Sequence, residues 1–386
     1  MRMKLLALAI LFQGRLLAVE LQPLLHVDLR GGMAAVGGQQ SSALLQGQLF
    51  AVPALQFNEK MVLMPSLYFL GGGQERSLQE TALFVRSASM GFKPQFRLRD
   101  DSGQAWTLAA DLRHAYNIEA VNENYGSGHY DYEDYGASLG WDRKLQEVPL
   151  GLNVRYAHRG YPNYHNIASE QSPGRNFYIK DYYGALGEAH ADLGPAGRVS
   201  LSFEQRSYPD SYVVDDSNGQ LKDEKQQDSL EDLSLRGSRA LDEAASLAIG
   251  WSAGWEGSQS NQNVFDSSQV QGLKNGNDYM SSSLGLSVQW RPAQTWSIQG
   301  GYSAQFRNFN RPIQLGDGSY QKGFVAEVEH DLDLGFKLPL PAGLAFVAAA
   351  NAEFLLSNQQ YTLAGIPSYN YYNANVGLQW DWKAGN

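Results

Sequence analysis

The stretch from Phe324 to Leu338 alternates between apolar and polar residues over 15 positions. Every even position is apolar apart from His330, and four successive odd positions are acidic. Only a β-strand has a period of two, and globular strands are usually about five or six residues long. A strand of this length therefore needs water along one face and an apolar environment along the other.

Similar alternating runs follow one another through most of the chain. The runs Trp296–Arg307 and Tyr372–Trp382 are the clearest, and further apolar rows extend upstream to Trp106. Aromatic residues gather at the ends of these rows, as they do in the interfacial girdles of a transmembrane barrel. A soluble sandwich would have shorter strands and more closely spaced turns. The sequence therefore predicts an all-β fold, a transmembrane antiparallel β-barrel.

The segments between the runs are alternately short and long, and together they predict about sixteen strands; fourteen and eighteen also fit. Outer-membrane barrels have short periplasmic turns and long extracellular loops, so we assign the two sets to those sides. Pro53 and Pro65 interrupt the N-terminal strands and would mark a bulge or an edge near barrel closure. The short turns are expected at Asn58–Lys60, Asp100–Gln104, Asp142–Pro149, Gly194–Gly197, Ala240–Ala244, Arg291–Gln294 and Pro339–Gly343, and the long loops at 31–42, 71–79, 117–130, 159–176, 208–227, 257–278, 308–321 and 356–369.

The first 18 residues have the pattern of a secretory signal peptide, with Arg2 and Lys4 before an apolar stretch and Ala18 as the cleavage point. This leaves 19–386 as a single barrel domain. The chain has no cysteine, which removes disulfides from consideration. Without the three basic residues of the signal, 27 Lys and Arg face 40 Asp and Glu, a net charge of −13. Such an acidic chain is a poor partner for nucleic acid.

In its strand pattern, its loop asymmetry and its aromatic final strand with Trp380 and Trp382, the chain resembles the outer-membrane porins as a broad class. The resemblance covers nearly all of residues 19–386. It implies a multi-pass barrel in a Gram-negative outer membrane, in contact with lipid and lipopolysaccharide. Barrels of this class usually end on a terminal aromatic residue, whereas here Lys383–Asn386 follow the last tryptophan.

Sorting strand residues by parity predicts which side chains line the lumen. A basic wall would then face an acidic wall across the pore, and such a transverse field would orient dipolar solutes. Alternatively, these charges pair between neighbouring strands and only keep the interior wet. The predicted acidic set is Glu327, Glu329, Asp331, Asp333, Glu353 and Asp381, and the predicted basic set is Lys93, Arg97, Arg99, Arg113 and Arg155.

Tyrosines are frequent in and beside the expected outer loops. An aromatic girdle with hydroxyls in the headgroup layer explains many of them. A smaller group would stack on sugar rings near the mouth of the barrel. Its members are Tyr125, Tyr130, Tyr132, Tyr161 and Tyr164.

Two stretches, Gly136–Gly140 and Gly250–Gly254, match the Gly-x-Ser-x-Gly pattern of a hydrolase nucleophile. That serine must project from a sharp turn between a strand and a helix, whereas both matches lie inside alternating runs. We therefore predict no enzyme. An acidic loop around Asp215 and Asp216 lacks the ligand spacing of a calcium loop, and no cofactor or metal site is predicted.

Two functions fit these predictions best. The first is a diffusion channel for small hydrophilic solutes. The second is an export pore for a polysaccharide, neutral or partly cationic to suit a net-acidic wall, acting with periplasmic and inner-membrane partners. An outer-membrane enzyme and a non-conducting structural barrel are the remaining alternatives, and the sequence does not choose between import and export.

Overall fold

The structure is a computed structural model that describes residues 20–22, 24–36, 42–78, 81–118, 126, 128, 130–164, 181–194, 197–214, 221–259, 264–265, 270–271, 278–293, 295–317, 319–360 and 368–383. The predicted signal peptide, residues 1–18, lies outside these ranges. In the described ranges no helix has the length and apolar character needed to cross a membrane.

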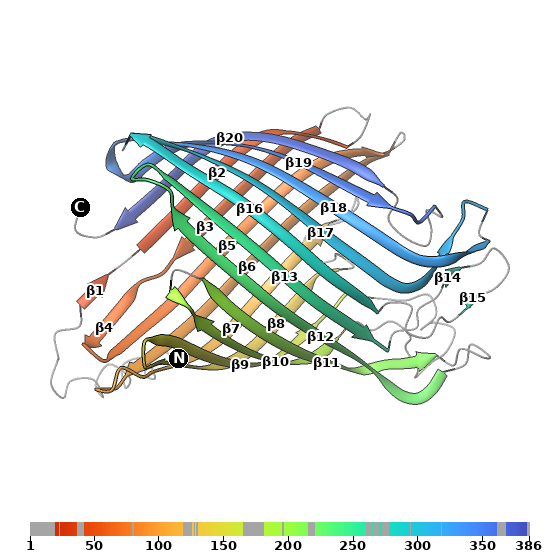
Figure 1. The fold of residues 1–386 in the computed structure, drawn as a ribbon, viewed down its shortest axis with the longest axis horizontal. Helices are drawn as coiled ribbons and strands as arrows, with labels where there is room; N and C mark the ends of the chain where they lie inside the picture. Colours follow the sequence, from red (N-terminus) through yellow and green to blue (C-terminus); the bar gives the residue numbers. More distant parts are fainter. Residues whose placement is uncertain are drawn as a thin grey trace.

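Sixteen long antiparallel strands close into a single barrel (Figure 1). Each strand pairs with its sequence neighbours, and the last strand pairs with the first from Leu24 opposite Lys383 to Val36 opposite Tyr371. The fold is therefore the predicted all-β barrel. The strands are β2 (Leu24–Val36), β3 (Ser42–Ala51), β5 (Met61–Leu78), β6 (Thr81–Arg99), β7 (Ala105–Ile118), β8 (Tyr132–Leu145), β9 (Val148–Gly160), β10 (Tyr182–Asp192), β11 (Arg198–Val214), β12 (Leu221–Ala240), β13 (Ala245–Ser258), β16 (Tyr279–Ala293), β17 (Trp296–Gln314), β18 (Tyr320–Pro339), β19 (Leu344–Ser357) and β20 (Tyr369–Lys383).

Four shorter strands and one short helix complete the described elements. β4 (Ala54–Asn58) follows β3 after Val52 and Pro53. β1 (Glu20–Gln22) precedes β2 in the chain and pairs with β4. Pro53 therefore marks a break between two strands, close to where the barrel closes. Pro65 lies within β5, where it is paired with Pro94 of β6. A small hairpin of β14 (Val264–Phe265) and β15 (Val270–Gln271) lies between β13 and β16, and the 3₁₀ helix Pro341–Gly343 joins β18 to β19.

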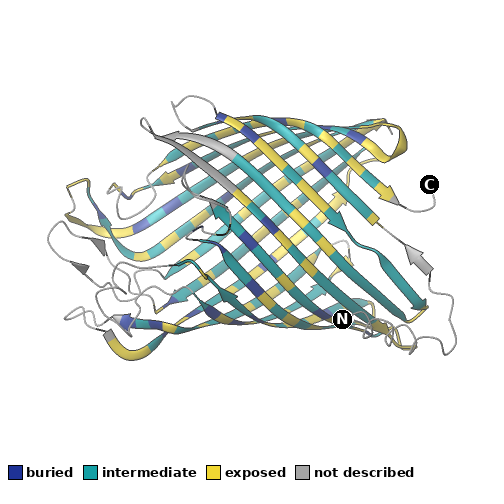
Figure 2. Cartoon of the chain, turned by 180° about the vertical axis from the view of Figure 1, so that it is seen from behind, coloured by how far each residue is buried: buried dark blue, intermediate teal, exposed yellow. Residues whose placement is uncertain are grey.

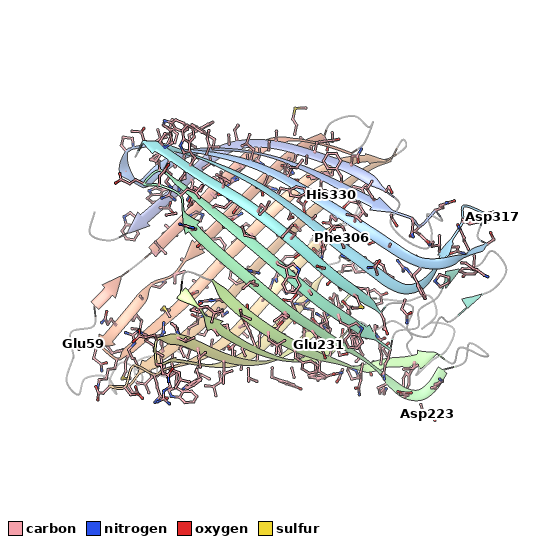
Figure 3. All side chains as sticks on the ribbon, in the orientation of Figure 1. Glu59, Asp223, Glu231, Phe306, Asp317 and His330 are labelled. Atoms are coloured by element: carbon pink, nitrogen blue, oxygen red, sulfur yellow. The ribbon has the colours of Figure 1, made fainter. Side chains whose placement is uncertain are left out.

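The seven short turns lie at one end of the barrel, called here the turn end, and the long connections lie at the other, the loop end. Figure 3 shows Glu59 at the turn end and Asp223 and Asp317 at the loop end. All seven turns occur where the sequence predicted them. The turn after β8 is shorter than predicted, because strand pairing continues to Leu145 opposite Val148.

Several predicted loops were wrong in extent, because antiparallel pairing continues well into them. The predicted loop 71–79 is mostly the end of β5, which pairs with β6 as far as Leu78 opposite Thr81. The predicted loops 31–42, 208–227 and 308–321 are also partly strand. These segments lack the regular alternation of apolar and polar residues that signals a strand, although the backbone pairing persists. In Figure 1 β11, β12, β17 and β18 extend past their neighbours at the loop end.

The outer wall is apolar, and along the strands exposed residues alternate with less exposed ones (Figure 2). Large apolar side chains of the outward rows remain accessible, for example Leu45 at 68% and Val154 at 62%. At the turn end, tryptophans of neighbouring strands contact one another in the pairs Trp106–Trp141 and Trp290–Trp296. The outward rows of β17 and β18 contain a polar pair, in which the Tyr302 hydroxyl lies 2.9 Å from His330 Nδ1. This hydrogen bond satisfies two polar groups on a lipid-facing surface.

Candidate functional site

A network of arginines and aspartates covers the inner wall of β7, β8 and β9. Asp134 is 4% exposed and binds two guanidinium groups, with Arg155 Nη2 at 2.7 Å from one carboxylate oxygen and Arg159 Nη2 at 2.7 Å from the other. Arg155 also lies 3.7 Å from Asp111. Inward residues on successive strands lie directly opposite one another, which is why residues 21 to 25 positions apart meet. These charges hold three strands together across the lumen wall.

Tyrosine rings and guanidinium groups alternate along the same wall towards β11. The Tyr132 ring contacts Arg113 and Arg159 at 5.2 and 4.5 Å, and the Tyr182 ring contacts Arg159 and Arg206 at 5.6 and 5.3 Å. Guanidinium groups are attracted to ring faces at such distances. The series therefore forms a continuous layer over five strands, here named the Arg–Tyr ladder.

The predicted basic residues all lie on β6, β7 and β9, but they differ in their surroundings. Arg113 and Arg155 belong to the packed wall just described. Arg97 lies 3.4 Å from Asp142 of β8, and Lys93 is half-buried on β6. Arg99 is exposed at the turn end, where β6 finishes. The basic wall is therefore partly neutralised by Asp111, Asp134 and Asp142 on the same or neighbouring strands.

The predicted acidic residues divide into paired and unpaired groups. Glu327 and Glu329 both reach Arg307 of β17, at 3.5 and 2.7 Å. Asp381 lies 2.6 Å from His26 and 3.7 Å from Lys337, and Glu353 accepts a hydrogen bond from the Tyr369 hydroxyl. Asp331 accepts only a 3.4 Å hydrogen bond from Ser303, and neither Asp331 nor Asp333 has a cationic partner in the described part of the chain.

The predicted sugar-stacking tyrosines come together in two ring pairs. Tyr132 and Tyr161 have ring centroids 5.8 Å apart, and Tyr130 and Tyr164 have centroids 5.9 Å apart. Tyr125 lies outside the described residues. Because the Tyr132 ring already contacts two guanidinium groups, its partners hold it in place as part of the wall.

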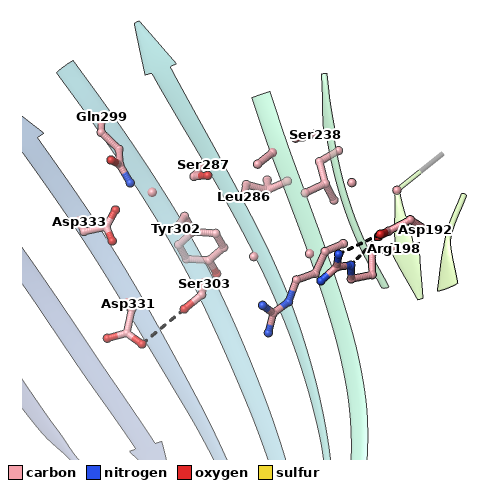
Figure 4. Close-up of a pocket in the computed structure, with 18 of the residues that line it drawn as sticks. Asp192, Arg198, Ser238, Leu286, Ser287, Gln299, Tyr302, Ser303, Asp331 and Asp333 are labelled. Carbon is pink, nitrogen blue, oxygen red and sulfur yellow. Dashed lines mark hydrogen bonds and ion pairs between the residues drawn. The ribbon is translucent and has the colours of Figure 1, made fainter. Parts of the chain in front are cut away.

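A cavity of about 620 Å³ lies along the inner face of β10 to β18 (Figure 4). Its floor is made of small residues that face one another on adjacent strands, including Gly250 opposite Gly285 and Ser287 opposite Gly301. Figure 4 shows Asp331 and Asp333 at one side and the Asp192–Arg198 pair at the other. A second cavity of about 400 Å³ shares Gln299 and Asp333 with the first and continues towards β2 and β20.

Several of these residues were missed from the sequence. Arg159 fell within a predicted loop, and Asp134, Tyr182 and Arg206 were not recognised as one group because cross-strand register was unknown. The small-residue floor did leave a signal, since the inward positions of β16 read Ser281, Ser283, Gly285 and Ser287. From the sequence alone, this row of small polar residues indicates only the polar face of a strand.

The two hydrolase-like motifs lie in strands, as predicted. Ser138 is in β8, and Ser252 is in β13 with its hydroxyl 2.7 Å from the hydroxyl of Ser283. Neither serine projects from a turn between a strand and a helix, which is the geometry that the motif requires.

No protein-family model and no curated protein sequence matches the chain. Among solved structures, it is similar to OmpT, an outer membrane protein of Vibrio cholerae, at 8% identity with a TM-score of 0.47, covering 94% of this chain and 98% of that one. It is similar to OpdO of Pseudomonas aeruginosa at 11% identity and a TM-score of 0.44, covering 95% and 98% of the two chains. The toluene transporter TodX of Pseudomonas putida matches at 13% identity and a TM-score of 0.41, covering 94% and 89%.

The protein has the fold of an outer-membrane β-barrel. A closed antiparallel barrel removes every strand edge, which is the condition for spanning a bilayer with strands. The apolar outer rows and the tryptophans at the turn end fit that location, and the polar inner wall is the part of the molecule available for function.

Proposed function

We propose that this barrel is a channel through which small hydrophilic solutes cross the outer membrane. The single observation that carries the proposal is the contrast between an apolar outer wall and a polar inner wall that bounds two joined cavities. Inward side chains such as Gln46, Gln48 and Arg236 are exposed, so the described strands do not fill the lumen between them. A structural barrel filled by its own side chains would bury these positions.

The charges of the wall suggest a preference for cations. β18 lies eight strands from β8 in either direction around the barrel, so the acidic row faces the Arg–Tyr ladder. The arginines of the ladder are largely balanced by Asp134 and Glu204, whereas Asp331 and Asp333 are not balanced by described residues. Unbalanced carboxylates raise the local cation concentration within a Debye length of about 10 Å at 0.1 M salt.

Planar bilayer recordings of the purified protein test this proposal. We expect ion conductance with cation preference, and we expect neutralisation of Glu327, Glu329, Asp331 and Asp333 to Gln or Asn to reduce that preference most at low salt. Liposome swelling with small sugars tests solute passage directly. A folded protein that neither conducts ions nor admits solutes would refute the channel and favour a plugged or structural barrel.

A hydroxyl row on the inner wall favours polysaccharide export as a second candidate. Ser200, Ser234, Ser252 and Ser283 lie opposite one another on β11, β12, β13 and β16. Their hydroxyls are 2.9 Å apart in the first pair and 2.7 Å in the last, and such a row can exchange hydrogen bonds with a sliding glycan. This function would require periplasmic and inner-membrane partners. A deletion strain that keeps its surface polysaccharide would exclude it.

A further inference from the structure

Three charged side chains on the inner wall of β12 and β18 lack an ion pair with any described residue. Arg236, Asp331 and Asp333 have no ion-pair partner in the described part of the chain. Most of the other inward charges form pairs between strands or along one strand. Examples are Asp134–Arg159 at 2.7 Å, Glu204–Arg206 at 2.9 Å and Glu329–Arg307 at 2.7 Å. Unpaired charges such as these are available to a solute.

All three unpaired residues line the same cavity of about 620 Å³. Arg236 leans over the floor, because its Cγ is 3.8 Å from the position that a methyl group on Gly250 would occupy. Asp333 leans over the floor from the other side, where its carboxylate fills the space that a side chain on Gly301 would need. The two glycines thus leave room for a cation and an anion to approach one another across a small-residue floor.

The register gives the distance between these two positions. Gly250 lies opposite Gly285, which lies opposite Ser303, and Gly301 is two residues further along β17. Two strand spacings of about 4.8 Å and two residues of about 3.3 Å place the Cα atoms of Gly250 and Gly301 roughly 12 Å apart along the wall. Water or a polar solute must occupy this interval, since the floor between them is glycine and serine.

We propose that this cavity is a binding site for zwitterionic solutes about the size of a tripeptide. The carboxylate end would face Arg236, and the ammonium end would face Asp331 and Asp333. An extended tripeptide spans roughly 10 Å, which matches the interval between the two sides. Amide groups along its backbone would meet Ser238, Ser287 and Gln299, which also line the cavity. A volume of this size lies within the range of about 300–1,000 Å³ that small-molecule sites occupy.

The site gains specificity from the separation of its charges. A solute with one charge can satisfy only one side, and it leaves the other charge facing water alone. A zwitterion of matching length satisfies both sides, and the hydrogen bonds involved are between charged groups. This inference rests on the proposed channel function for its biological meaning, but binding itself is measurable whether or not the barrel conducts.

Ligand variants test the site on the unaltered protein. Triglycine, N-acetyl-triglycine and triglycine amide are titrated into the folded, detergent-solubilised protein, and binding is followed by saturation-transfer NMR in low salt, where the Debye length is about 30 Å at 0.01 M. We expect each capped form to bind roughly tenfold more weakly than triglycine, which corresponds to about 1.4 kcal/mol. Equal binding of the three peptides would overturn the proposal.

Protein variants then identify which end meets which side. In the Asp331→Asn/Asp333→Asn protein, N-acetylation should cause no further loss, and in the Arg236→Gln protein, C-terminal amidation should cause none. Arg239→Gln and Glu231→Gln are matched controls, since both residues point outwards from β12 and should leave every peptide unchanged. If capping still weakens binding in the site variants, the charges do not act as assigned. Failure of conductance together with normal triglycine binding would refute the channel and leave the site standing.

Discussion

Replacing Asp134 with asparagine should destabilise the barrel more than any other single loss of charge on β8. The carboxylate is 4% exposed and binds both Arg155 and Arg159, each at 2.7 Å. An asparagine keeps one carbonyl acceptor, but it presents an amide donor to the second guanidinium. Arg159 then remains in the wall without a carboxylate partner among the described residues, and Arg155 keeps only Asp111, at 3.7 Å.

The magnitude follows from the two charged contacts. A hydrogen bond to a charged group contributes about 1.5–3 kcal/mol, and removing one partner of a buried ion pair costs about 3–5 kcal/mol. Because lumen water can reach the arginines in part, we expect a loss near the lower limit, about 3 kcal/mol. At 1.4 kcal/mol per factor of ten, this raises the unfolded fraction roughly 150-fold.

Reversible guanidinium unfolding in lipid vesicles, followed by the gel shift of heat-modifiable barrels, measures this loss. Asp142→Asn is the matched control, since it is an inward aspartate on the same strand, whose contact to Arg97 is 3.4 Å long and half exposed. Exposed pairs contribute about 0–1 kcal/mol, so this variant should unfold almost like the parent protein. If Asp134→Asn costs no more than Asp142→Asn, burial does not set the strength of these contacts.

Three further outcomes are expected. Leu332→Arg should hinder assembly, since a charge on the lipid face near the midplane costs about 2–4 kcal/mol. Asp331→Arg, one position away on the inward face, should still assemble. The reverse ranking in gel shifts of heat-modifiable barrels would contradict the assigned faces. An epitope tag within 215–220 should bind antibody on intact cells and a tag at Pro341 only after permeabilisation, so surface labelling at Pro341 would invert the orientation. Hydrogen bonds from Ser102 and Gln104 hold the pKa of Asp100 below its ordinary value, so Asp100→Ala should lower the melting temperature at neutral pH. This effect should shrink as the pH falls below the ordinary carboxyl range and the parent carboxyl takes up its proton; an effect that does not change with pH would show that the charge is irrelevant.

The barrel was predictable from sequence because the two faces of each strand meet very different environments. Lipid on one side and water on the other impose alternation on every strand, and the strand containing Phe324–Leu338 was located almost to its ends. The prediction failed at 71–79 and 308–321, because apolar and polar residues do not alternate regularly there although backbone pairing continues. Backbone pairing leaves no periodic trace in the side chains.

The site was less predictable because it depends on register. Parity indicated that Asp331 and Arg155 would point inwards, but it could not show which inward residues lie opposite one another. The pairing of Asp134 with two arginines and the placement of Arg236 and Asp333 over one glycine floor follow from the register between neighbouring strands. The sequence therefore indicates which charged residues face the lumen, but it does not show which of them form ion pairs with one another.

The seam between β2 and β20 sets the order in which this molecule can be built. Every other neighbouring pair of long strands is joined by a local connection, whereas the seam unites residues about 350 positions apart, such as Leu24 and Lys383. Closure entropy rises by about 0.6 kcal/mol for each doubling of loop length, so joining these ends directly costs roughly 4 kcal/mol more than closing a hairpin of four residues. Until the final strand arrives, the growing sheet has two unsatisfied edges, and each is a template for a wrong partner. The last step of biogenesis is therefore the step most in need of a catalyst, and β20 is the strand such a catalyst must deliver.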